Sequence, residues 1–238
     1  MILSALLRRD EIEPTLSIAG ATLVADVSGA LYEPDSGALI VADLHLEKGS
    51  SFARRGQFLP PYDTATTLGR LALLIETYRP RAVIALGDSF HDRWGASRLS
   101  GRDREALAAL QTRRDWIWIA GNHDPEAPAG CGGEAMAEMR LGGLTLRHEP
   151  RAGAAAGELA GHLHPVARVA ARGRSLGRRR CFATDGARVV LPAFGAYAGG
   201  LNVRDAAFGD LFGAGEMTAW VLGETAVYAI PSIGLRPD

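Results

Sequence analysis

The chain has 238 residues, of which 47% are hydrophobic and 22% are charged, and its formal net charge at pH 7 is −1. This balance excludes a chain that is mostly disordered. No run of about 18 uninterrupted apolar residues occurs, which excludes a transmembrane helix of the usual length. We expect one domain over residues 1–238, located in the cytoplasm and not attached to a membrane.

The N-terminus and the cysteines favour the same location. The short apolar stretch Met1–Leu7 precedes Arg8 and Arg9, whereas a signal peptide has its basic residues first. Cys131 and Cys181 are far apart and form no CxxC pair, as is typical of ordinary cytosolic thiols.

The first half of the sequence predicts alternating strands and helices. Short apolar runs, which are typical of buried strands, cover Ala38–Ala42, Ala82–Leu86 and Trp116–Ala120. Apolar residues at three- and four-residue spacing predict helices over Tyr62–Tyr78 and from about Asp103 to Arg113. Gly49–Pro61 is expected to be a loop. The alternation is typical of an open, mostly parallel sheet.

The second half is rich in predicted strands and poor in predicted helices. Met139–Leu146 is typical of a hairpin around two glycines. Further strands are expected at Val166–Ala170, Arg179–Ala183, Ala187–Leu191 and within Thr218–Ile230. The run Arg172–Arg180 holds five arginines and is interpreted as a solvated hairpin. We therefore expect a second sheet that packs on the first.

Residues that can bind metal ions follow each strand of the first half. The three strands are followed by DLH, GDSFH and GNHD, and the segments RHEP and GHLH come later. These five segments hold every histidine of the chain, with aspartates and an asparagine: Asp43, His45, Asp88, His91, Asn122, His123, Asp124, His148, His162 and His164. Ligands of open α/β sheets bind beyond the carboxyl ends of the strands, so we expect these side chains to meet there.

Each segment alone has an ordinary explanation. A single D-x-H or H-x-H occurs by chance, and GNHD can serve as turn chemistry in which Asx side chains bond their own backbone. The combination of all five, in order and at strand ends, favours a metal site. Imidazole, carboxylate and amide ligands without thiolate suit Mn²⁺, Fe or Zn²⁺. So many ligands exceed the needs of one catalytic ion and suit two, which can clamp a phosphoryl group during in-line displacement.

The order D-x-H, GD-x-x-H, GNHD, H and GH-x-H resembles the calcineurin-like metallophosphoesterase superfamily. The resemblance implies an α/β fold of four layers, an α/β/β/α sandwich of two mixed sheets flanked by helices. It implies a first metal ion held by Asp43, His45, Asp88 and His164. It implies a second held by Asp88, Asn122, His148 and His162, with Asp88 bridging. It also implies that His123 is the general acid or stabilises the transition state, and that Asp124 orients the His123 ring.

A narrower resemblance concerns the segment after Asp88. His91 stands three positions later, as in the DNA repair nucleases of the superfamily, and is a candidate catalytic residue. Its phosphoprotein phosphatases have GD-x-x-D-R-G, whereas Asp92 and Arg93 stand one position too late here. The segments at 42–64 and 191–203 resemble the bacterial ligase-associated DNA damage response endonucleases. That resemblance implies a manganese-dependent endonuclease acting on single-stranded DNA, encoded beside a DNA ligase, a helicase and an exonuclease.

Substrate contacts are harder to predict, because proteins that bind DNA usually carry a basic patch and the net charge is −1. Only Lys48 of the 26 basic residues is a lysine, and it follows the first ligand segment with Arg54 and Arg55. Arg93 and Arg98 follow the second. These residues contact phosphates or are solvated loop residues. A phosphatase, a cyclic-nucleotide phosphodiesterase and a non-catalytic scaffold are the alternative functions, the scaffold being disfavoured because all ligand positions are filled.

Overall fold

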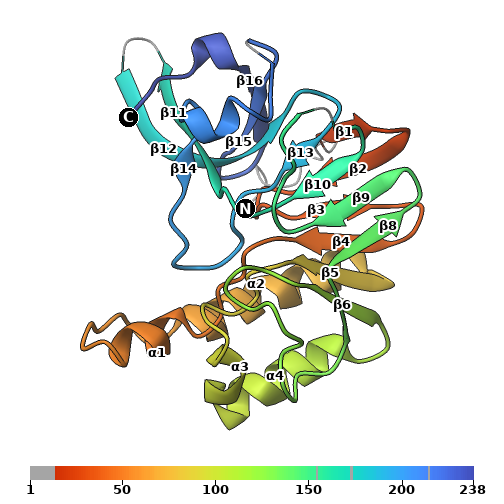
Figure 1. Ribbon diagram of the computed structural model, residues 1–238, viewed down its shortest axis with the longest axis vertical. Coiled ribbons are helices and arrows are strands. Elements are labelled where there is room, and N and C mark those ends of the chain that lie inside the picture. The colour runs from red at the N-terminus through yellow and green to blue at the C-terminus, as the bar shows by residue number, and fades with distance from the viewer. Residues whose placement is uncertain (1–13, 154, 172–173, 214) are drawn as a thin grey trace, which may run out of the picture.

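The computed structural model describes residues 14–153, 155–171, 174–213 and 215–238 (Figure 1). The interpretation of Met1–Leu7, Arg8 and Arg9 therefore concerns residues outside the described ranges, as does the start of the basic run at Arg172. Every helix within these ranges is too short or too polar to cross a membrane.

The first sheet is mixed and has its strands in chain order from β1 to β7. Neighbours from β1 to β4 are antiparallel, and neighbours from β4 to β7 are parallel. The strands are β1 (Thr15–Ile18), β2 (Ala21–Ala25), β3 (Leu31–Glu33), β4 (Ala38–Val41), β5 (Ala82–Leu86), β6 (Asp115–Ile119) and β7 (Glu134–Met136). The three predicted strands of the first half are thus confirmed as β4, β5 and β6. They are buried on both faces, as their continuous apolar runs predicted.

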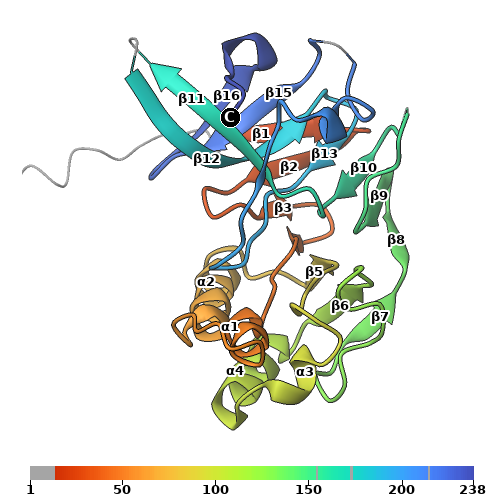
Figure 2. The same ribbon diagram turned by 60° about the vertical axis from the view of Figure 1, so that its left-hand side comes forward.

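Helices cover the outer face of the first sheet, at the bottom of Figures 1 and 2. They are α1 (Lys48–Ala53), α2 (Asp63–Tyr78), α3 (Gly95–Arg98) and α4 (Gly101–Gln111). The predicted spacing in α2 is confirmed, since Leu68, Leu71 and Leu74 are buried there. Ser100 caps α4 by accepting a hydrogen bond from the Asp103 N–H. The prediction of a loop over Gly49–Pro61 is wrong in its first part, because residues 49–53 belong to α1.

The second sheet runs in the order β14-β11-β12-β13-β10-β9-β8, and β15 pairs with β12 and with β16. Its strands are β8 (Glu138–Leu141), β9 (Leu144–Arg147), β10 (Glu158–Ala160), β11 (Pro165–Ala171), β12 (Arg174–Thr184), β13 (Val189–Val190), β14 (Leu201–Asn202), β15 (Thr218–Leu222) and β16 (Val227–Pro231). The predicted hairpin at Met139–Leu146 is confirmed as β8 and β9. The parallel pairing of β9 with β10 brings the carboxyl ends of these two strands together.

The two sheets share one apolar interior. Ile40, Ile84 and Ile117 of the first sheet belong to the same buried cluster as Leu146 and Phe182 of the second. The α/β architecture with two mixed sheets is therefore confirmed. Among the described residues, the layer outside the second sheet is thin and consists of the short 3₁₀ turns η1 (Ala206–Phe208) and η2 (Ser232–Gly234) with their loops.

A buried ionic network joins β9, β10 and the residue before β13 in the second sheet. Glu158 of β10 lies 3.6 Å from Arg147 at the end of β9 and 3.2 Å from Arg188 before β13. Its carboxylate also accepts a hydrogen bond from the Arg151 N–H. All three ionic side chains are buried, so each requires these partners. The network ties together the strands whose ends carry His148 and His162.

Candidate active site

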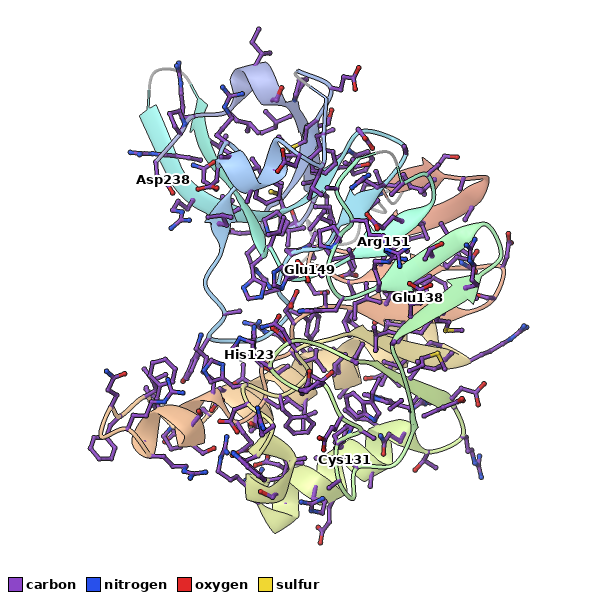
Figure 3. All side chains as sticks on the ribbon, viewed as in Figure 1. His123, Cys131, Glu138, Glu149, Arg151 and Asp238 are labelled. Atoms are coloured by element: carbon purple, nitrogen blue, oxygen red, sulfur yellow. The ribbon has the colours of Figure 1, made fainter. Side chains whose placement is uncertain are left out.

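The candidate site lies where the carboxyl ends of five strands meet. Loops after β4, β5 and β6 bring Asp43, Asp88 and Asn122 from the first sheet, and loops after β9 and β10 bring His148 and His162 from the second. In Figure 3, His123 lies between the helical half of the molecule and the second sheet. The predicted meeting of these side chains at one edge is therefore what the structure shows, with the second sheet contributing to it.

The backbone of the site is held in unusual conformations. Asp43, His45, Asp88, His162 and His164 all have positive φ angles, between 44° and 70°. Such angles are uncommon for residues other than glycine and gather at functional sites. The loops after β4 and β5 prolong the parallel pairing, since the His45 N–H donates to the Asp88 carbonyl oxygen at 2.9 Å. This pairing stabilises the strained turns.

One group of side chains consists of Asp43, His45 and His164, whose potential ligand atoms all lie within 4.8 Å of one another. Nε2 of His45 is 3.2 Å from Nε2 of His164, and Nε2 of His164 is 3.3 Å from Oδ1 of Asp43. The His162 N–H donates to the Asp43 carboxylate at 3.0 Å and fixes it in this position. This group corresponds to the predicted first metal site.

A second group consists of Asp88, Asn122, His148 and His162. Oδ1 of Asn122 lies 2.8 Å from Nε2 of His148 and 3.0 Å from Nδ1 of His162. Oδ1 of Asp88 lies 3.4 Å from Nε2 of His148. The Leu86 carbonyl oxygen lies 3.0 Å from Nδ1 of His148 and accepts a hydrogen bond from it, which leaves the Nε2 lone pair facing the group. This group corresponds to the predicted second metal site.

The donor atoms suit divalent metal ions. Ligands that bind an ion at about 2.0–2.2 Å stand roughly 3 Å apart, which is the spacing of the facing nitrogens and oxygens here. The site also needs neutral imidazoles. Burial lowers the pKa of His45 to about 2, and positive charge on His164, His123 and His91 lowers it further. His45 is therefore a neutral ligand near pH 7. The residues fit the two ions that the resemblance implies.

His123 is fixed by the main chain of His91 and not by Asp124. Nδ1 of His123 lies 2.6 Å from the His91 carbonyl oxygen, and its Nε2 lies 3.8 Å from Oδ2 of Asp88. The prediction that Asp124 orients the His123 ring is wrong, because Asp124 accepts a hydrogen bond from the Phe90 N–H at 3.0 Å. Burial raises the pKa of Asp124 to about 7, and the nearby Asp88 adds to this effect. Asp124 shapes the loop after β5, which carries His91.

The His91 side chain lies among other rings. Its imidazole is 5.3 Å from that of His123, 5.5 Å from that of His45 and 5.5 Å from the Phe52 ring. Burial lowers the pKa of His91 to about 4, and the charges of Lys48 and His123 act in the same direction. The ring is therefore neutral near pH 7. His91 lines both of the adjoining cavities at the site.

Lys48 reaches the cavity of about 400 Å³ that opens over the two ligand groups. His45, Asp88, Asn122 and His162 line this cavity with it. Nζ of Lys48 donates to the Tyr197 carbonyl oxygen at 2.9 Å and lies 5.8 Å from the centre of the Phe52 ring. Burial lowers its pKa, and Asp63 opposes this effect. A cation is thus held at the wall of the metal cavity.

Arg54 and Arg55 lie beside a second cavity of about 550 Å³, which shares His91, Asn122 and His123 with the first. Arg93 also lines this second cavity. Arg98 is the fourth arginine that follows the ligand segments, and it does not line this cavity. Its guanidinium instead donates two hydrogen bonds of 2.8 Å to the Asp92 carboxylate. Three of these four arginines therefore face the cavity.

Sequence reasoning missed the residues that hold Lys48 in place. Glu47 is buried, has a positive φ of 63° and binds the Thr64 hydroxyl at 3.0 Å. Asp63 accepts a hydrogen bond from the Gly49 N–H at 3.0 Å. These contacts tie the start of α1 to the start of α2. Both acids lie in the segment 42–64 that carried the resemblance, but nothing in the sequence pairs them with their partners.

Two glycines allow the ligand loops to approach one another. A Cβ atom at Gly87, whose φ is +71°, would fall on the His148 ring, and one at Gly121 would lie 2.7 Å from Oδ1 of Asp124 and against Asp88. No side chain fits at either position without displacing a residue of the site. The glycines in GDSFH and GNHD are therefore required by packing.

Comparisons with known proteins agree with this arrangement. A family profile described as calcineurin-like phosphoesterase matches residues 38–165, more than half of the chain. The crystal structure of Pseudomonas putida nuclease MPE is similar with a TM-score of 0.69 and 28% sequence identity, over 91% of this chain and 99% of that one. No match to a curated protein sequence was found. The ordered ligand segments, the two packed sheets and the family match show that this chain belongs to the calcineurin-like phosphoesterase family and is a metal-dependent phosphoesterase.

Proposed function

We propose that the protein is a binuclear phosphodiesterase that cuts single-stranded DNA with two Mn²⁺ ions. The observation that carries the proposal is that seven metal-ligand side chains meet in two adjoining groups, and that five of them line one cavity together with His123. An adjoining cavity that shares His123 is lined by arginines. The similarity over almost the full length to a Pseudomonas putida nuclease supports the same class of substrate.

The chain's own side chains divide the metal-binding work. Asp43, His45 and His164 would hold the first ion and Asn122, His148 and His162 the second, with Asp88 contributing to both. Two divalent ions held there would lower the pKa of a water molecule and neutralise charge on the phosphoryl group. The donor set is nitrogen and oxygen without thiolate, which suits Mn²⁺, Fe and Zn²⁺ alike. We choose Mn²⁺ among them because the segments at 42–64 and 191–203 resemble manganese-dependent endonucleases.

His123 would serve as the proton donor. Because its Nδ1–H donates to the His91 carbonyl oxygen, its Nε2 is the atom that faces Asp88 and the cavity. A protonated Nε2 at this position can donate to the leaving oxygen of the substrate or stabilise a phosphate oxygen. His91 would contribute its main-chain carbonyl to the position of His123 and its ring to the cavity wall.

The cations beside the cavity would bind the phosphates next to the one that is cut. Lys48 lies at the wall of the metal cavity, and Arg54 and Arg55 lie along the groove that leaves it. Phosphate contacts supply most of the sequence-independent affinity of proteins for nucleic acids. The groove thus gives a nearly neutral chain a local basic surface.

The decisive experiment compares three substrates with purified protein and Mn²⁺: a single-stranded oligonucleotide, the matching duplex and a small aryl phosphodiester. We expect cleavage inside the single strand and a lower kcat/KM on the other two. A higher kcat/KM on the small ester would favour the alternative of a small-molecule phosphodiesterase or phosphatase, for which the cavity of about 400 Å³ is large enough. Parallel assays with Fe²⁺ and Zn²⁺ test the choice of metal.

The proposal extends to a role in DNA repair in the cytoplasm. The segments at 42–64 and 191–203 resemble endonucleases that are encoded beside a DNA ligase, a helicase and an exonuclease. We therefore propose that the protein works with enzymes of these three classes. Co-purification with a ligase, helicase or exonuclease from the source cells tests whether they also bind one another.

A further inference from the structure

The groove next to the metal cavity contains an exposed tryptophan. Trp94 lines the cavity of about 550 Å³ together with His91 and His123, and its side chain is 59% exposed. The other tryptophans differ from it, because Trp116 and Trp118 are buried and Trp220 is half-buried. Single exposed aromatic residues are common, so the exposure alone indicates nothing. The surroundings of Trp94 make it informative.

The backbone of Trp94 is held on both sides. Its N–H donates to Oδ1 of Asp92 at 2.9 Å, and its carbonyl oxygen accepts from the Ser97 hydroxyl at 2.7 Å. Asp92 is itself fixed by the two hydrogen bonds from Arg98, whose Nε also donates to the Ser50 hydroxyl at 2.8 Å. The indole therefore projects from a rigid position although little packs on it. An aromatic side chain on a fixed backbone has only two rotatable bonds, so it loses little conformational freedom when a ligand binds.

The charge around Trp94 favours an anionic ligand. Arg54, Arg55 and Arg93 are exposed, and within the described ranges none of the three has a carboxylate partner. Asp92, the acidic side chain in this cavity, is paired with Arg98. An exposed aromatic face among unpaired guanidinium groups is the combination by which proteins bind single-stranded nucleic acids.

We propose that Trp94 is a stacking platform for one nucleobase of the substrate, next to the phosphate that is cut. This inference rests on the proposed function and adds a base-binding subsite to it. The scissile phosphate lies over the ligand groups, the strand leaves along His91 and His123, and the adjoining base stacks on the indole. Arg54, Arg55 and Arg93 bind the phosphates on either side of that base.

The subsite also selects single strands. A base can stack on Trp94 only after it leaves its neighbours and its pairing partner, and in a duplex this costs the free energy of unstacking and unpairing. In a single strand this cost is small, because the base has no pairing partner. Stacking on Trp94 therefore lowers the free energy of the single-stranded complex relative to that of the duplex complex.

The test measures binding and cleavage of a single-stranded oligothymidylate by wild-type protein and by Trp94→Ala, Trp94→Phe and Tyr228→Ala. Tyr228 on β16 is the matched control, because it is 55% exposed and lies at the opposite end of the molecule from α3 (Figures 1 and 2). Alanine at Trp94 keeps the backbone contacts to Asp92 and Ser97, and thermal melting checks that the fold is intact. Affinity is measured in a His123→Ala background by the fluorescence anisotropy of a dye-labelled oligothymidylate, and the quenching of tryptophan fluorescence is recorded as a separate signal.

We expect Trp94→Ala to weaken binding by about 5- to 150-fold, the loss typical for one stacked base. Trp94→Phe should restore most of the affinity but lose the fluorescence quenching, and Tyr228→Ala should match wild type. An oligomer of the same length in which every position is abasic gives an independent readout. Wild-type protein should bind this oligomer more weakly than the oligothymidylate, and the difference should be smaller for Trp94→Ala.

The two ways in which the test can fail are separable. If wild-type protein neither binds nor cuts the single strand, the proposed function is wrong and the subsite falls with it. If wild-type protein cuts the strand but Trp94→Ala binds it equally well, the subsite alone is wrong. Equal quenching in wild type and Trp94→Phe would likewise overturn the contact between the base and the indole.

Discussion

The His123 ring is oriented by a main-chain atom, because its Nδ1 lies 2.6 Å from the His91 carbonyl oxygen while its Nε2 faces Asp88. This places a donor at the cavity without the help of a carboxylate. We predict that His123→Ala lowers turnover on DNA by about 10²- to 10⁴-fold, the usual contribution of general acid catalysis. Metal content, measured by mass spectrometry, should not change.

The defect of His123→Ala should depend on the leaving group. An aryl phosphodiester releases a stabilised phenolate and needs little protonation, so its defect should be smaller than that on DNA. Asp124→Asn is the matched control. Asp124 contacts the Phe90 N–H and not the His123 ring. The Asp124→Asn variant should therefore be less stable, but the ratio of its turnover on DNA to its turnover on the aryl ester should equal that of wild type. Equal defects of His123→Ala on both substrates would instead assign it to phosphate stabilisation.

Asp88 lies between the two ligand groups and is assigned to both ions. We predict that Asp88→Ala removes activity and lowers the metal content of the protein, because both sites lose a ligand. His123→Ala is the control, because we expect this variant to lose activity but to keep both metal ions. Full metal occupancy with normal turnover in Asp88→Ala would contradict the two-metal assignment.

Lys48 is held at the cavity wall by the Tyr197 carbonyl oxygen and the Phe52 ring. We predict that Lys48→Ala lowers kcat/KM on single-stranded DNA more than on a small phosphodiester, since only DNA has further phosphates. Arg179→Ala, an exposed arginine of β12, is the control for a general change in net charge. Equal losses on the two substrates would give Lys48 a structural or catalytic role.

His91 makes a defined contribution to the pH dependence of stability. Its pKa is about 4 in the folded protein and 6.5 in the unfolded chain, so the unfolded chain binds more protons between these values. The contribution of His91 to stability is therefore present above about pH 6.5 and is lost as the pH falls toward 4. The melting temperature of chelator-treated His91→Gln should decline less on acidification than that of wild type. His45, Asp124 and His164 titrate in both proteins, so the difference between the two curves reports the His91 ring together with its charge effect on His45. Parallel curves would contradict the assignment.

Gly87 is required by the contact between the two sheets. Gly87→Ala places a methyl group on the His148 ring at a positive φ, and we predict a loss of about 2–5 kcal/mol in the free energy of unfolding. Gly20→Ala shares the positive φ but meets no atom within 4 Å, so only about 1–2 kcal/mol should be lost. Denaturant unfolding measures both. Equal losses would mean that the His148 loop adjusts freely.

Local patterns in the sequence determined three strands of the first sheet, β4, β5 and β6, together with α2 and the candidate ligands. They gave no sign of β1, β2, β3 and β7, and the first sheet is mixed where a mostly parallel one was expected. The apolar runs of β4, β5 and β6 are buried on both faces, so their composition alone indicates strands of a covered parallel sheet. The polar residues that follow these strands had to lie at one edge, because parallel strands end on the same side. This is why the order of residues alone places Asp43, Asp88 and Asn122 together.

Only the tertiary structure decided which of these side chains contact one another. His148 meets Asn122 and Gly87 because the ends of β9 and β10 pack against those of β4 to β6, and no local pattern encodes contacts between sheets. The same reason explains why Asp124 binds the Phe90 N–H, why Arg98 is committed to Asp92, and why Trp94 remains exposed beside His123. Each of these contacts depends on loops that are distant in sequence. The loops are brought together when the two sheets bury their shared apolar interior, and this burial is a property of the whole chain.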